Sequence, residues 1–168
     1  MNRAAALAAA ASTLAFALGA GTAPKQPPRY LDAVRQELAR LGVDAACETD
    51  AGVCSFRRRL PGLGIDLDAT VACSDQTSTV YVAIPRFLAL GGEEGPPAAL
   101  ARRLLDLNRR LVTSKLEWDP LSRSIRLTTV LSTDSSFDRR AFRSQVLALF
   151  AAAERLLPEL EVLAAARE

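Results

Sequence analysis

The three cysteines are the most reactive side chains in this sequence. Cys47 and Cys54 flank a tight turn, and if Asp50 and Ala51 form its tip, the two thiols lie opposite each other on paired strands. Such a pair can form a disulfide in an oxidising compartment. The alternatives are two small buried side chains, or pairing of Cys54 with Cys73, which we otherwise assign to the core. A zinc site would need a fourth ligand that no histidine can supply, so we predict no metal and no cofactor.

The sequence also gives little support for acid–base catalysis. The absence of histidine removes the commonest general base and the usual pH switch. Asp66 and Asp68 alternate onto one face of a predicted strand, but no base or pocket accompanies them, which is typical of a solvated strand face. The sequence contains no phosphate-cradling glycine loop and no nucleophile motif. We therefore predict no catalytic residues and no enzymatic activity.

Two features could contact a partner. Arg57, Arg58 and Arg59 form a run that could bind phosphate or an acidic protein, although a strand end with solvated charges is the favoured explanation. Tyr81 alternates onto the face opposite the apolar residues of its strand, where an amphipathic ring would be available if that face is open. We take Tyr81, Arg57 and Arg59 as candidate partner-binding residues.

The bulk charge and the N-terminus bear on partners and location. A net charge of +2, from 21 basic and 19 acidic residues, provides no field to hold nucleic acid. Residues 1–23 place Arg3 before a short, alanine-rich apolar run, which predicts a signal peptide and a secreted or periplasmic protein without a stable membrane anchor. The alternative is an alanine-rich leader on a cytoplasmic protein. Residues 24–29 read as a proline-rich linker.

Residues 97–137 organise the rest of the chain. Leu100, Leu104, Leu107 and Leu111 recur at helical spacing, and from Val112 the spacing changes to two. This change predicts a helix that leads directly into a hairpin, whose turn is formed by residues 119–122.

The remaining elements follow from the same periodicities. A helix over 29–41 ends before Gly42, and a candidate hairpin over 44–59 follows it. Further strands are expected at 65–73 and at 80–84, the last limited by Pro85. Asp138 is predicted to cap a final helix from Arg139 to about Leu157, with Phe137 and Phe142 as a hydrophobic staple. Pro158 is expected to interrupt that helix.

Short turns between neighbouring strands indicate an antiparallel sheet, and the helices must cover one of its faces. The predicted fold class is an α+β two-layer sandwich with the order α-β-β-β(-β)-α-β-β-α. We expect one domain over residues 30–160 and a C-terminal tail over 161–168.

This order resembles that of the YbjN family, described as sensory-transduction regulators, which is similar in fold to the class I type III secretion chaperones. The resemblance is carried by Leu104-Leu105-Asp106-Leu107-Asn108 leading into Leu116-Glu117-Trp118-Asp119, by Ile125-Arg126-Leu127, and by Phe142, Val146 and Phe150. In the chaperone relatives the fold implies homodimers that hold an extended client segment. The family brings no catalytic residues.

We therefore predict a non-enzymatic, chaperone-like protein that binds a polypeptide partner, or its own copy as a homodimer, through a sheet or helix surface. The alternatives are a cytoplasmic type III secretion chaperone and a secreted domain that binds a small molecule or lipid between sheet and helices.

Overall fold

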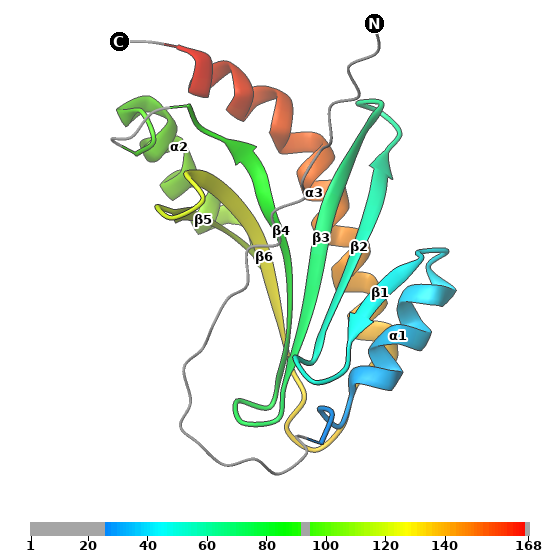
Figure 1. Cartoon of the computed structure of the whole chain (residues 1–168). Coiled ribbons are helices and arrows are strands. Elements are labelled where there is room, and N and C mark those ends of the chain that lie inside the picture. The colour runs from blue at the N-terminus through cyan, green and yellow to red at the C-terminus, as the bar shows by residue number, and fades with distance from the viewer. Residues whose placement is uncertain (1–25, 92–94, 167–168) are drawn as a thin grey trace, which may run out of the picture.

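A computed structural model describes residues 26–91 and 95–166 and confirms the predicted α+β class (Figure 1). The predicted order is also observed, with four strands before the second helix and two after it. The elements are α1 (Leu31–Arg40), β1 (Ala45–Glu48), β2 (Val53–Leu60), β3 (Ile65–Ser74), β4 (Thr79–Ala89), α2 (Ala98–Arg110), β5 (Ser114–Asp119), β6 (Ser124–Ser132) and α3 (Arg139–Ala165).

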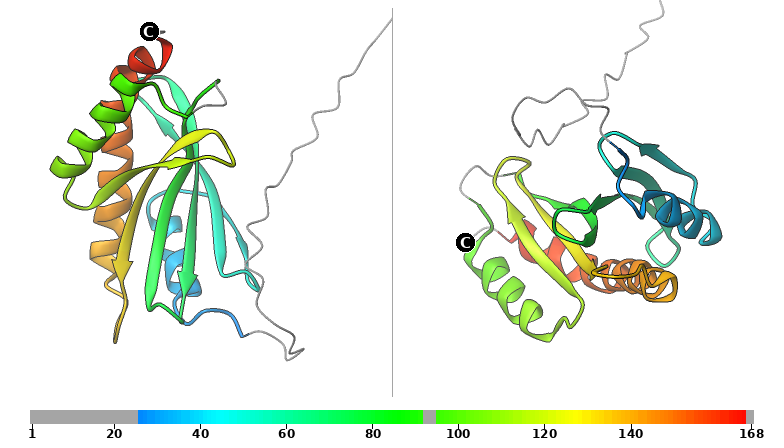
Figure 2. Two further views of the ribbon diagram at one scale, coloured as in Figure 1. Left: turned by 90° about the vertical axis from the view of Figure 1, so that its left-hand side faces the viewer. Right: turned by 90° about the horizontal axis from the view of Figure 1, so that it is seen from below.

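The six strands form one antiparallel sheet in the order β1-β2-β3-β4-β6-β5. All three helices lie along one face of it, with α3 between α1 and α2 (Figure 2). The core fills the space between the layers and includes Val71 and Val82 from the sheet, Leu100 from α2 and Phe142 from α3. The other face carries no helix of the described chain, so the sheet has one dry face and one wet face.

Local signals place the helix ends where the sequence predicts them. At the end of α1 the amide of Gly42 donates to the carbonyl of Ala39 (3.0 Å) and that of Val43 to Leu38 (3.1 Å), with Gly42 at a φ of 71°. These two bonds make a Schellman motif, which requires a left-handed residue that glycine adopts without strain. At the start of α3 the Asp138 carboxylate accepts two backbone amides at 2.9 Å.

The predicted end of the fourth strand at Pro85 is wrong. β4 continues to Ala89, and its register with β6 shifts between Ile84 and Leu88. This irregularity removes the need for a donor at Pro85, whose carbonyl accepts from the Ser124 hydroxyl at 3.2 Å. A bulge thus carries the strand past the proline.

The predicted interruption at Pro158 is also wrong, because α3 runs unbroken to Ala165. A proline inside a helix costs about 3 kcal/mol relative to alanine. Leu156, Leu157 and Leu160 are buried on both sides of Pro158, and their packing holds the helix together through it. Residues 161–165 of the predicted tail therefore continue the same helix.

The predicted signal peptide, residues 1–23, lies outside the described residues. At the end of the predicted linker, the backbone amide of Arg29 donates to the Asp75 carboxylate (3.0 Å), and the Tyr30 ring stacks on Phe137. None of the helices over residues 26–91 and 95–166 has the length and apolar character needed to cross a membrane.

Leu104 and Leu105 provide a matched test of the helix register. Leu104 is 7% exposed and faces the core, whereas its neighbour Leu105 is 68% exposed. Leu104→Ala is expected to lower the free energy of unfolding by about 2–5 kcal/mol because it leaves a cavity. Leu105→Ala should change it by no more than about 0.5 kcal/mol. Urea denaturation of both variants measures the difference, and equal losses would contradict the register.

Candidate functional site

Cys47 and Cys54 lie directly opposite each other on β1 and β2, and the structure joins them in a disulfide. The alternative partner, Cys73, is free and buried on the same face of the sheet. Burial, together with the negative charge of Asp75, raises the pKa of the Cys73 thiol to about 11. Cys73 is therefore protonated at neutral pH and is a poor nucleophile toward the neighbouring disulfide.

The face of the sheet that no helix covers is called the open face below. Its side chains are those that alternate away from the helices on five strands. They are Ser55, Arg57 and Arg59 on β2; Asp66, Asp68, Thr70 and Ala72 on β3; Tyr81 and Ala83 on β4; Arg126, Thr128 and Val130 on β6; and Lys115 and Glu117 on β5.

Arg57 and Arg59 lie on the open face, and each faces an aspartate on β3. Arg57 Nε contacts Asp68 Oδ1 at 2.7 Å, and Arg59 Nη1 lies 3.8 Å from Asp66 Oδ1. All four side chains remain largely exposed, so these ion pairs are screened and contribute little to stability. Two arginines of the run are thus balanced across the sheet by the two aspartates, whereas Arg58 points to the helix-covered face, where its guanidinium lies 5.5 Å from the centre of the Phe150 ring.

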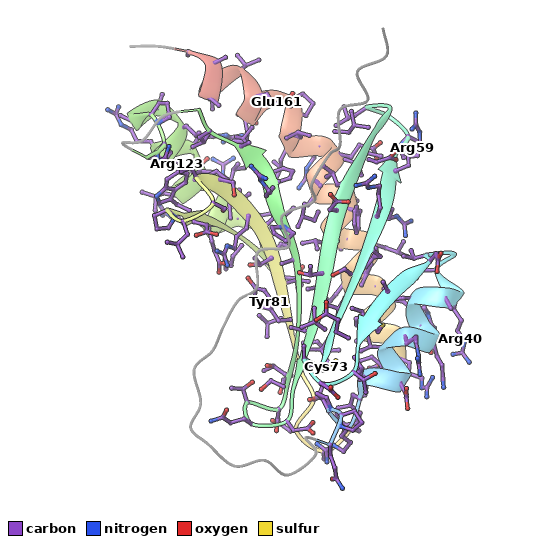
Figure 3. The ribbon with its side chains drawn as sticks, in the orientation of Figure 1. Arg40, Arg59, Cys73, Tyr81, Arg123 and Glu161 are labelled. Carbon is purple, nitrogen blue, oxygen red and sulfur yellow. A yellow bond between two sulfur atoms is a disulfide. The ribbon has the colours of Figure 1, made fainter. Side chains whose placement is uncertain are left out.

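Tyr81 lies on the opposite half of the open face, between Ala72 on β3 and Val130 on β6. Its ring is partly buried, and its hydroxyl donates to Glu117 Oε2 at 3.3 Å. Burial and the Glu117 charge raise the pKa of Tyr81, which keeps the hydroxyl protonated as a donor. Figure 3 shows Tyr81 beside β4 and Arg59 near the end of β2, so the structure does not bring the candidate residues into one cluster.

Small residues lie between these two halves. Thr70 pairs directly with Ala83, and Ala72 lies next to them on β3. A shallow hollow of about 380 Å³ opens beside Thr70 and is bordered by Ser55 and Arg57. A second hollow of about 260 Å³ lies between the end of α2, the start of β5 and α3.

The edge strand β5 is closed by a side chain from α2. The Asn108 amide donates to the carbonyl of Leu116 and accepts from its N–H, both at 2.8 Å. An asparagine amide has the same donor and acceptor as a peptide group, so Asn108 replaces the strand that would otherwise add at this edge. Lys115 Nζ completes the contact by donating to the last carbonyls of α2 at Asn108 and Leu111.

Glu37 of α1 is fully buried against α3 and is surrounded by three arginines. Oε1 accepts from Arg40 (2.6 Å) and Arg139 (3.0 Å), and Oε2 accepts from Arg143. Burial acts to raise the pKa of Glu37, but the arginine hydrogen bonds and charges outweigh it and hold the pKa below its ordinary value. We call these four residues the Glu37 cluster.

Sequence reasoning missed both Asn108 and the Glu37 cluster. In the sequence, Asn108 was noted within the stretch that carries the family resemblance, although its place just before a predicted strand was also a usable signal. The Glu37 cluster joins residues about a hundred positions apart, and no local pattern indicates it. Over residues 26–91 and 95–166, no group of three or more cysteine or acidic side chains is arranged to hold a metal ion.

Comparison with known proteins identifies the fold. No family model matches the chain, and no curated protein matches its sequence. The ExsC–ExsE complex is similar in structure with a TM-score of 0.57 and 13% identity, over 83% of this chain and 96% of the other. YbjN from E. coli is similar with a TM-score of 0.56 and 20% identity, over 79% of this chain and 91% of YbjN. For the HopA1–SchA chaperone–effector complex the TM-score is 0.49 and the identity 14%, over 82% of this chain and 94% of the other. The predicted likeness to YbjN is thus confirmed for the fold, which the ExsC–ExsE structure shares.

The Asn108 contact can be tested by removing its amide. Asn108→Ala loses both bonds to Leu116, so the free energy of unfolding should fall by about 1–3 kcal/mol. The exposed edge should also promote self-association, which light scattering detects. Arg109→Ala, one residue further along the exposed end of α2, is the control. A variant as stable and as small in solution as the parent would rule out the edge-closing role.

The Glu37 carboxylate predicts an acid-sensitive fold. Its pKa is lowered in the folded state, so its stabilisation is complete above the ordinary value of about 4.5 and is lost as the pH falls below it. Glu37→Gln should cost about 1–3 kcal/mol at neutral pH, since the hydrogen bonds from the arginines lose their charged acceptor. The variant should lose less stability than the parent between neutral and acidic pH. Denaturation at several pH values measures both effects, and parallel pH profiles would contradict the assignment.

Proposed function

We propose that this chain is a non-enzymatic, chaperone-like protein that binds a polypeptide partner across the open face. The observation that carries the proposal is the uncovered face of a sheet six strands wide, opposite a helix-covered core. A surface of this breadth suits an extended polypeptide. A lipid held between sheet and helices would need an enclosed apolar cavity, whereas the core there is formed by fully buried side chains such as Val82, Leu127 and Leu149. The hollow of about 260 Å³ at the end of α2 has Ser114 and Arg155 in its lining and is not purely apolar.

The chemistry of the open face supports an exchangeable contact. Its ion pairs, Arg57 with Asp68 and Arg59 with Asp66, are exposed and therefore weak. A carboxylate of the bound polypeptide can replace either aspartate at little cost in free energy, since the arginine and the aspartate of each pair are already exposed to water. The hollow beside Thr70, which Ser55 and Arg57 border, gives an extended backbone room to approach the sheet.

Tyr81 is the proposed anchor of this contact. Tyrosine presents a large apolar surface with a polar tip and loses little conformational entropy on binding. Its cross-strand neighbours on this face are Ala72 and Val130, and Val130 is itself 51% exposed. A partner side chain placed here would bury both residues and keep the hydroxyl bonded to Glu117.

The comparisons support a protein-binding role at the level of the fold. The ExsC–ExsE structure is a complex, and its likeness extends over 83% of this chain. Self-association through the same face is a variant of the proposal in which the partner is a second copy.

We further propose that the protein works outside the reducing cytoplasm. The apolar N-terminus has the pattern of a signal peptide, and Cys47 and Cys54 are positioned to form a cross-strand disulfide. N-terminal sequencing of the protein from its host tests this directly. A mature chain that begins within residues 15–30 supports export, whereas an intact Met1 supports the cytoplasmic alternative.

Photo-crosslinking from Tyr81 tests the open face as the binding surface. A photoreactive phenylalanine at position 81 should form an adduct with a second polypeptide in the native host. The same probe at Leu105, which is exposed on the helix layer, is the control. Adding Arg57→Glu and Arg59→Glu should reduce the adduct several-fold. Adducts of twice the chain mass would identify a second copy, and adducts from position 105 alone would refute the proposal.

A further inference from the structure

The Glu37 cluster presents more positive charge than its structural role requires. Glu37 and Arg40 lie one turn apart on α1, and Arg139 and Arg143 lie one turn apart on α3. All three guanidinium groups contact the same carboxylate. Since Glu37 neutralises one of them, two positive charges remain at this site, and no other carboxylate of the described residues pairs with these arginines.

The remaining charge is accessible. The Glu37 side chain has no exposure, whereas the side chains of Arg40, Arg139 and Arg143 are 60%, 44% and 34% exposed. The acid is thus beneath the surface and the cations are on it. Guanidinium groups gathered around one carboxylate also repel each other, so an added anion would be stabilised by all three.

The geometry leaves the binding side of each guanidinium available. Every hydrogen bond to Glu37 uses the Nη1 atom of its arginine, and Arg139 Nη1 also donates to Gln36 Oε1 at 3.0 Å. The Nη2 and Nε atoms of these arginines form no hydrogen bond to another described residue. A guanidinium binds a carboxylate in a bidentate manner through such a pair of donors.

We propose that the Glu37 cluster is a preorganised site for the carboxylates of an acidic segment in a polypeptide partner. Glu37 fixes three arginines that would otherwise be mobile, so a ligand does not have to order them. The surplus of two charges fits a segment with two neighbouring acidic side chains. The choice of a polypeptide over nucleic acid rests on the proposed function and on the near-balanced charge of the whole chain.

A peptide titration tests the site without knowledge of the natural partner. Acetylated hexaglutamate is titrated into the full chain at low ionic strength, and binding is followed by calorimetry. The double variant Arg139→Lys with Arg143→Lys keeps the charge and the ion pairs to Glu37 but loses the forked donors. We expect its affinity for the peptide to fall at least tenfold. Arg155→Lys on the same helix, which forms no ion pair within the described chain, is the matched control and should bind as the parent does.

The outcomes separate this proposal from the previous one. If hexaglutamate does not bind the folded parent, or if Arg155→Lys weakens binding as much as the double variant, the site is overturned. Tighter binding of an oligonucleotide with the same arginine dependence would assign the site to nucleic acid and also overturn the proposal. Circular dichroism verifies that each variant is folded. Should the double variant unfold, Arg40→Lys on α1 replaces it, with at least a threefold loss expected. The result does not depend on crosslinking from Tyr81, so either proposal can fail alone.

Discussion

The contact between the Asn108 amide and the backbone of Leu116 is the constraint on which the arrangement of surfaces depends. If both the β1 edge and the β5 edge of the sheet were free, strands of further copies could add at either edge and the chain could polymerise. Asn108 closes the β5 edge from within the chain and ties the end of α2 to the strand that follows it. The helix layer is thereby anchored at one end, and the open face and the β1 side of the sheet remain for contact with other molecules.

Most of the fold could be predicted because its signals are local. A change from helical to alternating spacing at Val112 marks the passage from α2 to β5, and an aspartate before an amphipathic run marks the start of α3. The opposition of Cys47 and Cys54 follows from counting outward from a turn. In each case the residues that form the contact lie within a few positions of one another, where periodicity and turn chemistry apply.

The parts that could not be predicted depend on tertiary packing. Pro85 and Pro158 have strong local preferences, which a bulge accommodates in one case and buried leucines overcome in the other. The position of Glu37 shows the same limit for charge. A glutamate on a short amphipathic helix is ordinarily a solvated residue, and only the approach of α3 turns it into a buried carboxylate with three partners.

The comparison of the two arginine groups shows why a charged run is a poor guide to a charged surface. Arg57 and Arg59 are neighbours on one face of β2, yet the antiparallel register places an aspartate opposite each and removes the local excess. Arg40, Arg139 and Arg143 are scattered, yet one buried acid gathers them into the more positive site. Because that site joins α1 to α3, an acidic ligand bound there would also hold α1 against the helix layer. α1 leads directly into β1, so an acidic ligand bound at the Glu37 cluster would restrict the motion of the β1–β2 hairpin at the β1 edge of the sheet.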